Sequence, residues 1–332
     1  MGKILSPEQA RATYDLKKGP TNDISEFEVA LEQEGIGVVE IPFSQSDFDA
    51  FREGFIVCKN ECPEALLETA GRFDERRGSE YGYTRKELEI DLVTGKQKED
   101  PKHITHFYNG VYNLWQERFA RGPKPLRDFL AMGMELEDAF VGVALQTAKV
   151  LDAGGHPNLL QAYAPEGRTR AFMRYVHYDS YEPFDEEGNL IPMNADVAKR
   201  HYDIGGITFQ GPTSASGFQA NKQGLFGHDD AWQDYDSVSG EAQVLFGRTH
   251  NKVFPFDDPL GHRVRRLIPK DKEVALEDGR LVMSQAGTLL VPERSALILF
   301  FDMPDVDAKI SKQETLGLVA LNGEHLRSET VT

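Results

Sequence analysis

The chain has 332 residues and a mass of 37.2 kDa, with 40% hydrophobic and 27% charged residues. These values are ordinary for a globular protein, and no apolar run approaches the roughly 20 residues that a membrane span needs. Its 37 basic and 54 acidic residues give a formal net charge of −17, which disfavours nucleic acid and anionic membranes as partners.

The two cysteines, Cys58 and Cys62, match neither a CxxC redox motif nor a four-ligand zinc set. We therefore expect reduced thiols. The first residues, MGKILSPEQARATY, do not have the apolar stretch of a secretory signal, and we expect a cytoplasmic protein.

The first region, residues 1–155, is predicted to be mainly helical. A short apolar strand is predicted at 35–41 (GIGVVEI), followed by a helix at 44–60, where Phe48, Phe51, Phe55 and Ile56 recur at helical spacing. A second, longer helix is predicted at 125–151. We expect this region to pack against the remainder of the chain.

The second region, residues 156–332, changes to short segments that are rich in β-formers and separated by glycine. Strands are predicted at 170–178, 204–210, 217–220, 242–246, 288–292 and 295–301. Strands at this spacing favour a sandwich or a jelly roll over alternating βα units. The predicted fold class is therefore α+β, mainly β: a double-stranded β-helix (a cupin-like jelly roll) flanked by N-terminal helices, the two regions forming one compact unit.

His201 and Asp203 are the first candidate site residues. They lie in KRHYDIGGITFQ (199–210), which we predict to be one strand, and residues two apart on a strand project from the same face. An imidazole and a carboxylate suit a borderline divalent metal. A further histidine would complete the 2-His-1-carboxylate triad that leaves open positions on ferrous iron.

Two histidines downstream, His250 and His262, compete to be the third ligand. The segment that contains both, AQVLFGRTHNKVFPFDDPLGHRV (242–264), resembles the corresponding stretch of isopenicillin-N-synthase-like and plant-type 2-oxoglutarate-dependent oxygenases. In that family a strand reaches a glycine, here Gly247, and the ligand histidine follows in an HRV string. The resemblance implies His262 as the ligand, with His250 as the alternative.

The same resemblance implies a binding site for the cosubstrate 2-oxoglutarate. Arg294 and Ser295 match the family's R-x-S string only in part, because the family's serine falls at Ala296. A guanidinium can hold the distal carboxylate of 2-oxoglutarate through two parallel hydrogen bonds. Tyr178 matches a cosubstrate-contacting tyrosine, and strand alternation places Arg174 on the same face, where it would meet the primary substrate.

The resemblance implies an oxidoreductase, an Fe(II)- and 2-oxoglutarate-dependent dioxygenase that uses O₂ to hydroxylate or desaturate a small metabolite of biosynthesis. Three alternatives stay open: an oxidase of the isopenicillin N synthase kind that uses no 2-oxoglutarate, a cupin-like enzyme with another metal, and a non-catalytic ligand-binding barrel. Fold cannot choose among the substrates that such barrels accept.

Overall fold

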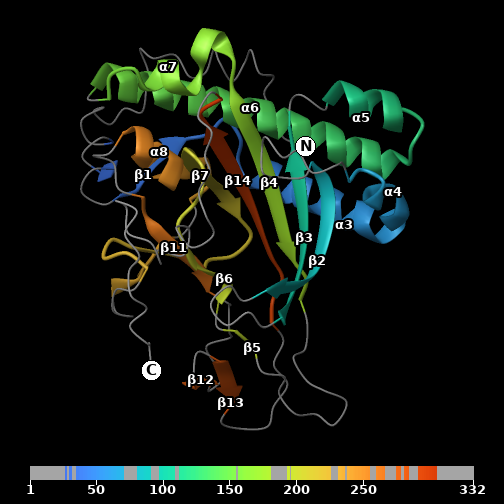
Figure 1. The fold of residues 1–332 in the computed structure, drawn as a ribbon. Helices are drawn as coiled ribbons and strands as arrows, with labels where there is room; N and C mark the ends of the chain where they lie inside the picture. Colours follow the sequence, from blue (N-terminus) through green and yellow to red (C-terminus); the bar gives the residue numbers. More distant parts are fainter. Residues whose placement is uncertain are drawn as a thin grey trace.

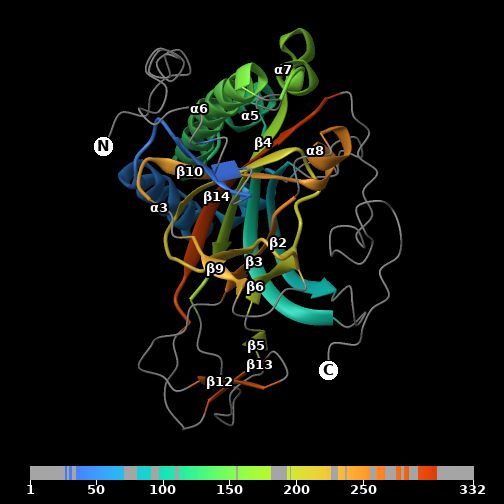
Figure 2. The same ribbon diagram turned by 90° about the vertical axis from the view of Figure 1, so that its left-hand side faces the viewer.

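The computed structural model describes residues 27, 30–31, 35–70, 81–90, 97–108, 112–154, 156–180, 193–194, 196–225, 231–235, 238–254, 259–265, 274–277, 280–283 and 291–304. In this part of the chain, two antiparallel sheets pack face to face, and helices cover the outer face of the larger sheet (Figures 1 and 2). Phe218 of the smaller sheet and Leu245 of the larger one share a buried cluster between the sheets.

The larger sheet has seven strands in the order β1-β10-β7-β14-β4-β3-β2. Their bounds are β1 (Gly37–Glu40), β10 (Glu241–Phe246), β7 (Ile207–Thr213), β14 (Arg294–Asp302), β4 (Arg170–Tyr178), β3 (Gln97–Phe107) and β2 (Gly82–Ile90). The alternation of β14 is informative, because Leu297, Leu299 and Phe301 join the main hydrophobic core under the helices. Arg294, Ala296 and Ile298 therefore face the other sheet.

The smaller sheet has four strands in the order β6-β11-β8-β9. They are β6 (Asp196–His201), β11 (Gly261–Arg265), β8 (Phe218–Asn221) and β9 (Gln233–Asp234). A third sheet joins β12 (Val274–Glu277), β13 (Arg280–Met283) and β5 (Met193–Asn194), and both ribbon views place it at the end of the molecule away from the long helix (Figures 1 and 2).

The helices are α3 (Gln45–Glu61), α4 (Pro63–Leu67), α5 (Tyr112–Phe119), α6 (Lys124–Gly154), α7 (Leu159–Tyr163) and α8 (Arg248–Val253), with one 3₁₀ turn at Pro165–Gly167. Helices α3 and α6 pack on the outer face of the seven-stranded sheet, whereas α8 begins with backbone hydrogen bonds to the turn after β6. A capping box formed by Ser44 and Asp47 begins α3. No helix in the described ranges is both long enough and apolar enough to cross a bilayer.

Close packing of α6 on the sheet depends on a small residue. At Gly133 an added Cβ would lie 2.1 Å from Cε1 of Phe107 on β3, so only glycine lets the helix approach this closely. Phe51 and Phe55 of α3 contact Phe129 of α6 and Tyr175 of β4; Phe51 stacks on Phe129, and both rings of α3 meet Tyr175 edge to face. These aromatic contacts form the buried layer between the helices and the sheet.

The architecture confirms the predicted fold class of a mainly antiparallel β-structure with flanking helices. The strand predicted at 35–41 is β1, and the helices predicted at 44–60 and 125–151 are α3 and α6. The first region also contributes β1, β2 and β3 to the seven-stranded sheet, so the sheet is built from both sides of residue 155.

One local prediction is wrong. The segment 199–210 is two strands of different sheets, because β6 ends at His201 and β7 begins at Ile207. A turn with two glycines connects them. An added Cβ at Gly206 would lie 2.6 Å from the hydroxyl of Tyr163 and from the carbonyl of Phe301, so the chain needs glycine to turn here.

Candidate metal centre

The turn after β6 brings Asp203 beside His201. The Asp203 carboxylate lies with its Oδ1 3.6 Å from Nε2 of His201. Asp203 is buried, and its backbone carbonyl accepts a hydrogen bond of 2.9 Å from the amide of Arg248, which fixes the turn. The two side chains thus converge through a turn and not through the alternation of one strand.

His262 completes the group from the neighbouring strand. It lies directly opposite His201 in the antiparallel pairing of β11 with β6, and the two ring centroids are 4.3 Å apart. Its Nε2 lies 3.6 Å from the second carboxylate oxygen of Asp203. One ligand atom from each of the three residues lies within 4.8 Å of the others, so the structure brings the three predicted ligands together.

Hydrogen bonds outside the group orient each ligand. Nδ1 of His201 donates to the carbonyl of Lys199 at 2.7 Å, and Nδ1 of His262 donates to the carbonyl of Leu260 at 3.1 Å. With a proton on Nδ1, the lone pair of each ring is on Nε2, the atom that faces Asp203. Such contacts are typical of histidines that bind a metal.

The electrostatics of the group favour the ionised carboxylate. Burial by itself raises the pKa of Asp203, but the electrostatic interactions with His262 and His201 and the hydrogen bond from Thr208 outweigh it and hold that pKa well below its usual range. Burial lowers the pKa of His262 to about 4, so this ring is neutral at neutral pH. Burial also disfavours a charged His201, but its attraction to Asp203 and its hydrogen bond to the carbonyl of Lys199 raise its pKa overall.

The donor set fits a divalent transition metal. Two neutral imidazole nitrogens and one carboxylate on one side of an ion leave the opposite side for other ligands. A carboxylate and two histidines held in place without a metal would need protons to balance the buried charge. The three residues therefore suit Fe(II), which is the metal expected from the sequence.

Arg294 begins β14 on the inner face of the seven-stranded sheet. Only 5% of it is exposed, and its Nη2 is buried with no hydrogen-bond partner among the described residues. Its Nε is 3.4 Å from the carbonyl of Ser216. Burial lowers the pKa of Arg294, and the nearby Tyr178, its partner in the β14–β4 register, opposes that effect. A buried guanidinium in which one nitrogen has no hydrogen-bond partner among the described residues suits a carboxylate ligand.

The metal group and Arg294 share one side of the sheet. Thr208 lies opposite Phe300 in the β7–β14 register, and Phe300 is six residues along β14 from Arg294 and on the same face. The hydroxyl of Thr208 donates to Asp203 at 2.6 Å. The space between the two sheets is therefore common to the ligand group and to the arginine.

Ser295 points to the other face of β14. Its hydroxyl is fully buried and hydrogen-bonds with the hydroxyl of Tyr175 at 3.1 Å and with Nδ1 of His177 at 2.8 Å. The structure does not bring Ser295 together with Arg294. Ala296 lies on the same face of β14 as Arg294, but alanine has no hydroxyl.

The contacts of Ser295 belong to a polar network that the sequence did not reveal and that runs from buried histidines to the exposed Asp179. His177 lies 3.1 Å from Asp179, which accepts from Nε2 of His103 at 2.7 Å, and Nδ1 of His103 hydrogen-bonds with the hydroxyl of Tyr83 at 2.7 Å. Lys59 of α3 pairs with the same carboxylate. This network ties α3 to β2, β3 and β4 beside the ends of the strands that hold Tyr178 and Arg294.

Arg174 lies on the inner face of β4, as strand alternation predicts. It is opposite Ile298 on β14 and His106 on β3. Its Nε donates to Nε2 of His106 at 2.8 Å, and its guanidinium carbon lies 4.8 Å from the ring centroid of Phe300. His106 was not singled out in the sequence, where only its spacing from His103 places the two rings on opposite faces of one strand.

The alternative ligand, His250, lies elsewhere. It is fully buried in α8, stacks on Phe246 with ring centroids 3.9 Å apart, and hydrogen-bonds through Nδ1 with the hydroxyl of Tyr163 at 2.7 Å. The group that could hold a metal in the described residues contains His262 and not His250.

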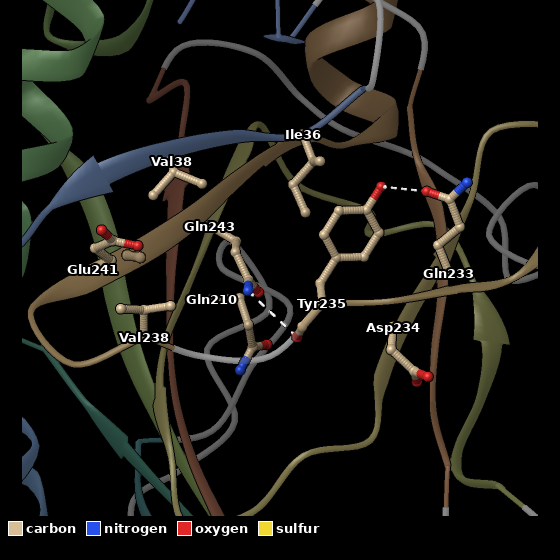
Figure 3. A pocket seen from close by; sticks show the side chains of 10 residues that line it. Ile36, Val38, Gln210, Gln233, Asp234, Tyr235, Val238, Glu241 and Gln243 are labelled. Atoms are coloured by element: carbon tan, nitrogen blue, oxygen red, sulfur yellow. Dashed lines mark hydrogen bonds between the residues drawn. The ribbon is translucent and has the colours of Figure 1, made fainter. Parts of the chain in front are cut away.

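A separate pocket opens at the β1–β10 edge of the larger sheet. Figure 3 shows this pocket, which has a volume of about 460 Å³. It is lined by Ile36, Val38, Gln210, Gln233, Asp234, Tyr235, Val238, Glu241, Ala242 and Gln243. None of the predicted site residues lines it. One of its lining residues, Gln210, is opposite Ile298 in the β7–β14 register and so faces the smaller sheet.

Solved structures with this fold were found, although no protein-family model and no curated protein matches the sequence. A structure of JOX2 in complex with 2OG, Fe and JA superposes with a TM-score of 0.57 at 19% identity, covering 95% of this chain and 78% of that one. A full-length Neurospora crassa protein in complex with alpha-KG gives a TM-score of 0.57 at 15% identity, covering 90% of this chain and 80% of that one.

A third match is a dioxygenase for auxin oxidation from Arabidopsis thaliana in its 2-oxoglutarate binary complex. Its TM-score is 0.55 at 14% identity, and the alignment covers 91% of this chain and 94% of that one. These identities are low, so what the matches share with this chain is the arrangement of strands and helices. With its sheets, its flanking helices and its His-Asp-His group, the chain has the fold of the 2-oxoglutarate- and Fe(II)-dependent oxygenases.

Proposed function

We propose that this protein is an Fe(II)- and 2-oxoglutarate-dependent dioxygenase that hydroxylates or desaturates a small metabolite. The observation that carries the proposal is the convergence of His201, Asp203 and His262 in the same inter-sheet space as the buried Arg294. Solved structures of the same fold that hold 2-oxoglutarate support it.

His201, Asp203 and His262 would hold the metal, and Arg294 would bind the distal carboxylate of 2-oxoglutarate. Once bound, Fe(II), 2-oxoglutarate and O₂ supply the oxidation, which yields succinate and carbon dioxide from the cosubstrate. Tyr178, next to Arg294 in the strand register, would contact the same carboxylate. Ser295 has no part in this proposal, because its hydroxyl is engaged on the other face of the sheet.

The protein itself would position the metal ligands and the substrates and exclude water from the site. The hydrogen bonds to Lys199, Leu260 and Thr208 fix the ligands before the metal arrives, so little reorganisation is needed on binding. Arg174 faces the same space and would contact the primary substrate. The cytoplasmic location expected from the sequence stays a prediction.

The proposal is tested by loading the full chain with Fe(II) and measuring succinate formed from 2-oxoglutarate with and without O₂. We expect succinate that requires both Fe(II) and O₂, even without a primary substrate, and none from the Asp203→Ala variant. O₂ consumption without succinate would favour the oxidase that uses no 2-oxoglutarate. A protein that binds Fe(II) and 2-oxoglutarate but never consumes O₂ would favour a ligand-binding barrel.

A further inference from the structure

Arg174 is a second cation inside the barrel wall, distinct from the one assigned to the cosubstrate. It lies near the middle of β4, four residues from Tyr178, the register partner of Arg294. At about 3.3 Å per residue, the backbone positions of the two arginines are about 13 Å apart along the strand direction of the sheet. They are therefore suited to two different anionic groups.

The guanidinium of Arg174 is held on two sides. Its Nε donates to Nε2 of His106 at 2.8 Å, so that His106 ring must carry its proton on Nδ1. Its flat face lies over Phe300 at 4.8 Å and near Phe172 at 6.0 Å from the ring centroids. These contacts restrain the side chain, and they leave the edge that carries Nη1 and Nη2 turned away from the histidine.

No carboxylate of the described chain forms an ion pair with Arg174. Among the carboxylates, Asp203 has the strongest electrostatic interaction with Arg174. Asp203 already contacts His201, His262 and Thr208. Arg174 is partly exposed, and burial lowers its pKa. A restrained, partly buried guanidinium beside a site for a divalent cation is stabilised by a negatively charged partner, and no carboxylate of the described residues forms an ion pair with it.

We propose that the Nη1–Nη2 edge of Arg174, oriented by His106, binds a carboxylate of the primary substrate, and that the substrate is therefore a small carboxylic acid. This inference rests on the proposed function, because it assigns the substrate class of that same site. A planar fork of two N–H donors matches the two oxygens of a carboxylate, and it loses most of its partners when an amide replaces the acid.

The test compares carboxylic acids with their primary amides on the full chain loaded with Mn(II) and 2-oxoglutarate, by isothermal titration calorimetry. The probes are phenylacetate, 3-phenylpropanoate and octanoate, each beside its amide. We expect the wild-type protein to bind at least one acid at least ~10-fold more tightly than its amide, as a charge-assisted pair predicts. A set in which no acid is preferred overturns the proposal.

The variants separate the two arginines. Arg174→Gln should abolish the preference for the acid and change the affinity for 2-oxoglutarate less than ~2-fold, whereas Arg294→Gln should weaken 2-oxoglutarate by ~10-fold or more. Arg174→Lys, which keeps the charge without the fork, should retain part of the preference. The exposed Arg121→Gln should behave like wild type.

Two results would contradict the assignment. One is an Arg174→Gln protein that still prefers the acid, and the other is an Arg174→Gln protein that loses 2-oxoglutarate as strongly as Arg294→Gln does. If Arg174→Gln does not fold, as judged by its thermal melting, the wild-type comparison of acid and amide still decides. Failure of the proposed function is distinguished separately, because it would appear as absent Fe(II)- and O₂-dependent succinate.

Discussion

The hydroxyl of Thr208 donates a hydrogen bond of 2.6 Å to Oδ2 of Asp203, and this bond ties the turn that carries the carboxylate to the seven-stranded sheet. Thr208 belongs to β7 of the seven-stranded sheet, while the two histidines belong to β6 and β11 of the four-stranded sheet. The carboxylate is therefore aimed at the histidines by a residue of the opposite wall.

Replacing Thr208 by valine removes that bond without a large change of shape. We expect Thr208→Val to weaken metal binding by ~10-fold, because a ligating carboxylate that loses its outer contact is less well oriented. Titration of the apo protein with Mn(II), followed by calorimetry, measures the effect. Thr208→Ser, which keeps the hydroxyl, is the matched control, and equal losses in both variants would point to packing in place of the hydrogen bond.

Each of His201→Ala, Asp203→Ala and His262→Ala should abolish stoichiometric Fe(II) binding and the succinate formation that depends on it, because a ligand atom is lost from a set of three. The matched comparison is His250→Gln, which removes a buried hydrogen bond to Tyr163. It should lower the free energy of unfolding by ~1–3 kcal/mol and leave the metal stoichiometry unchanged. Metal analysis after gel filtration distinguishes these outcomes, and a fully loaded His262→Ala protein would refute the ligand assignment.

Loss of Arg294 should affect the cosubstrate and not the metal. Arg294→Gln should raise the Kd for 2-oxoglutarate by ~10- to ~100-fold, as expected for a charge-assisted pair, with Fe(II) stoichiometry unchanged. Calorimetric titration with 2-oxoglutarate in the presence of Mn(II) measures it. Unchanged affinity for 2-oxoglutarate would favour the oxidase alternative.

Two glycines of α6 provide a matched pair of substitutions. Gly133→Ala should destabilise the protein by ~1–3 kcal/mol, because the new methyl group would clash with the ring of Phe107. Gly142→Ala should stabilise it by ~0.5–1 kcal/mol, since nothing lies within 4 Å of the added Cβ and alanine is the better helix former. Urea unfolding of the two variants checks the signs, and a destabilising Gly142→Ala would show that α6 is not packed as described.

Acid should weaken the fold through His177. Its side chain is 1% exposed, and burial, aided by the charge of Lys59, lowers its pKa to about 4, whereas the unfolded chain has a pKa near 6.5. Above pH 6.5 both states are neutral and nothing changes. Between pH 6.5 and 4 the unfolded state binds the proton first, so the free energy of unfolding falls by an amount on the order of 3 kcal/mol.

The variant His177→Gln cannot bind this proton and isolates the effect. The difference in unfolding free energy between wild type and His177→Gln should shift against the wild type as the pH falls from 7 to 4. Urea titrations at several pH values measure it. Parallel pH profiles for the two proteins would show that His177 does not titrate in this range on unfolding.

The sequence alone determined the elements whose signal is local. Amphipathic spacing located α3 and α6, β-rich segments located β4, β10 and β14, and the His-x-Asp pair pointed to a metal. These patterns arise from which face of each element must be buried, and that requirement is written in the spacing of apolar residues.

The tertiary structure decided what depends on distant parts of the chain. It divided the segment 199–210 between two sheets, and in the connecting turn Tyr163 and Phe301 approach Gly206 so closely that no side chain fits there; no local propensity contains that contact. It also turned Ser295 toward His177 and set His106 beside Arg174, since the register between strands far apart in the chain is fixed by packing across whole sheets.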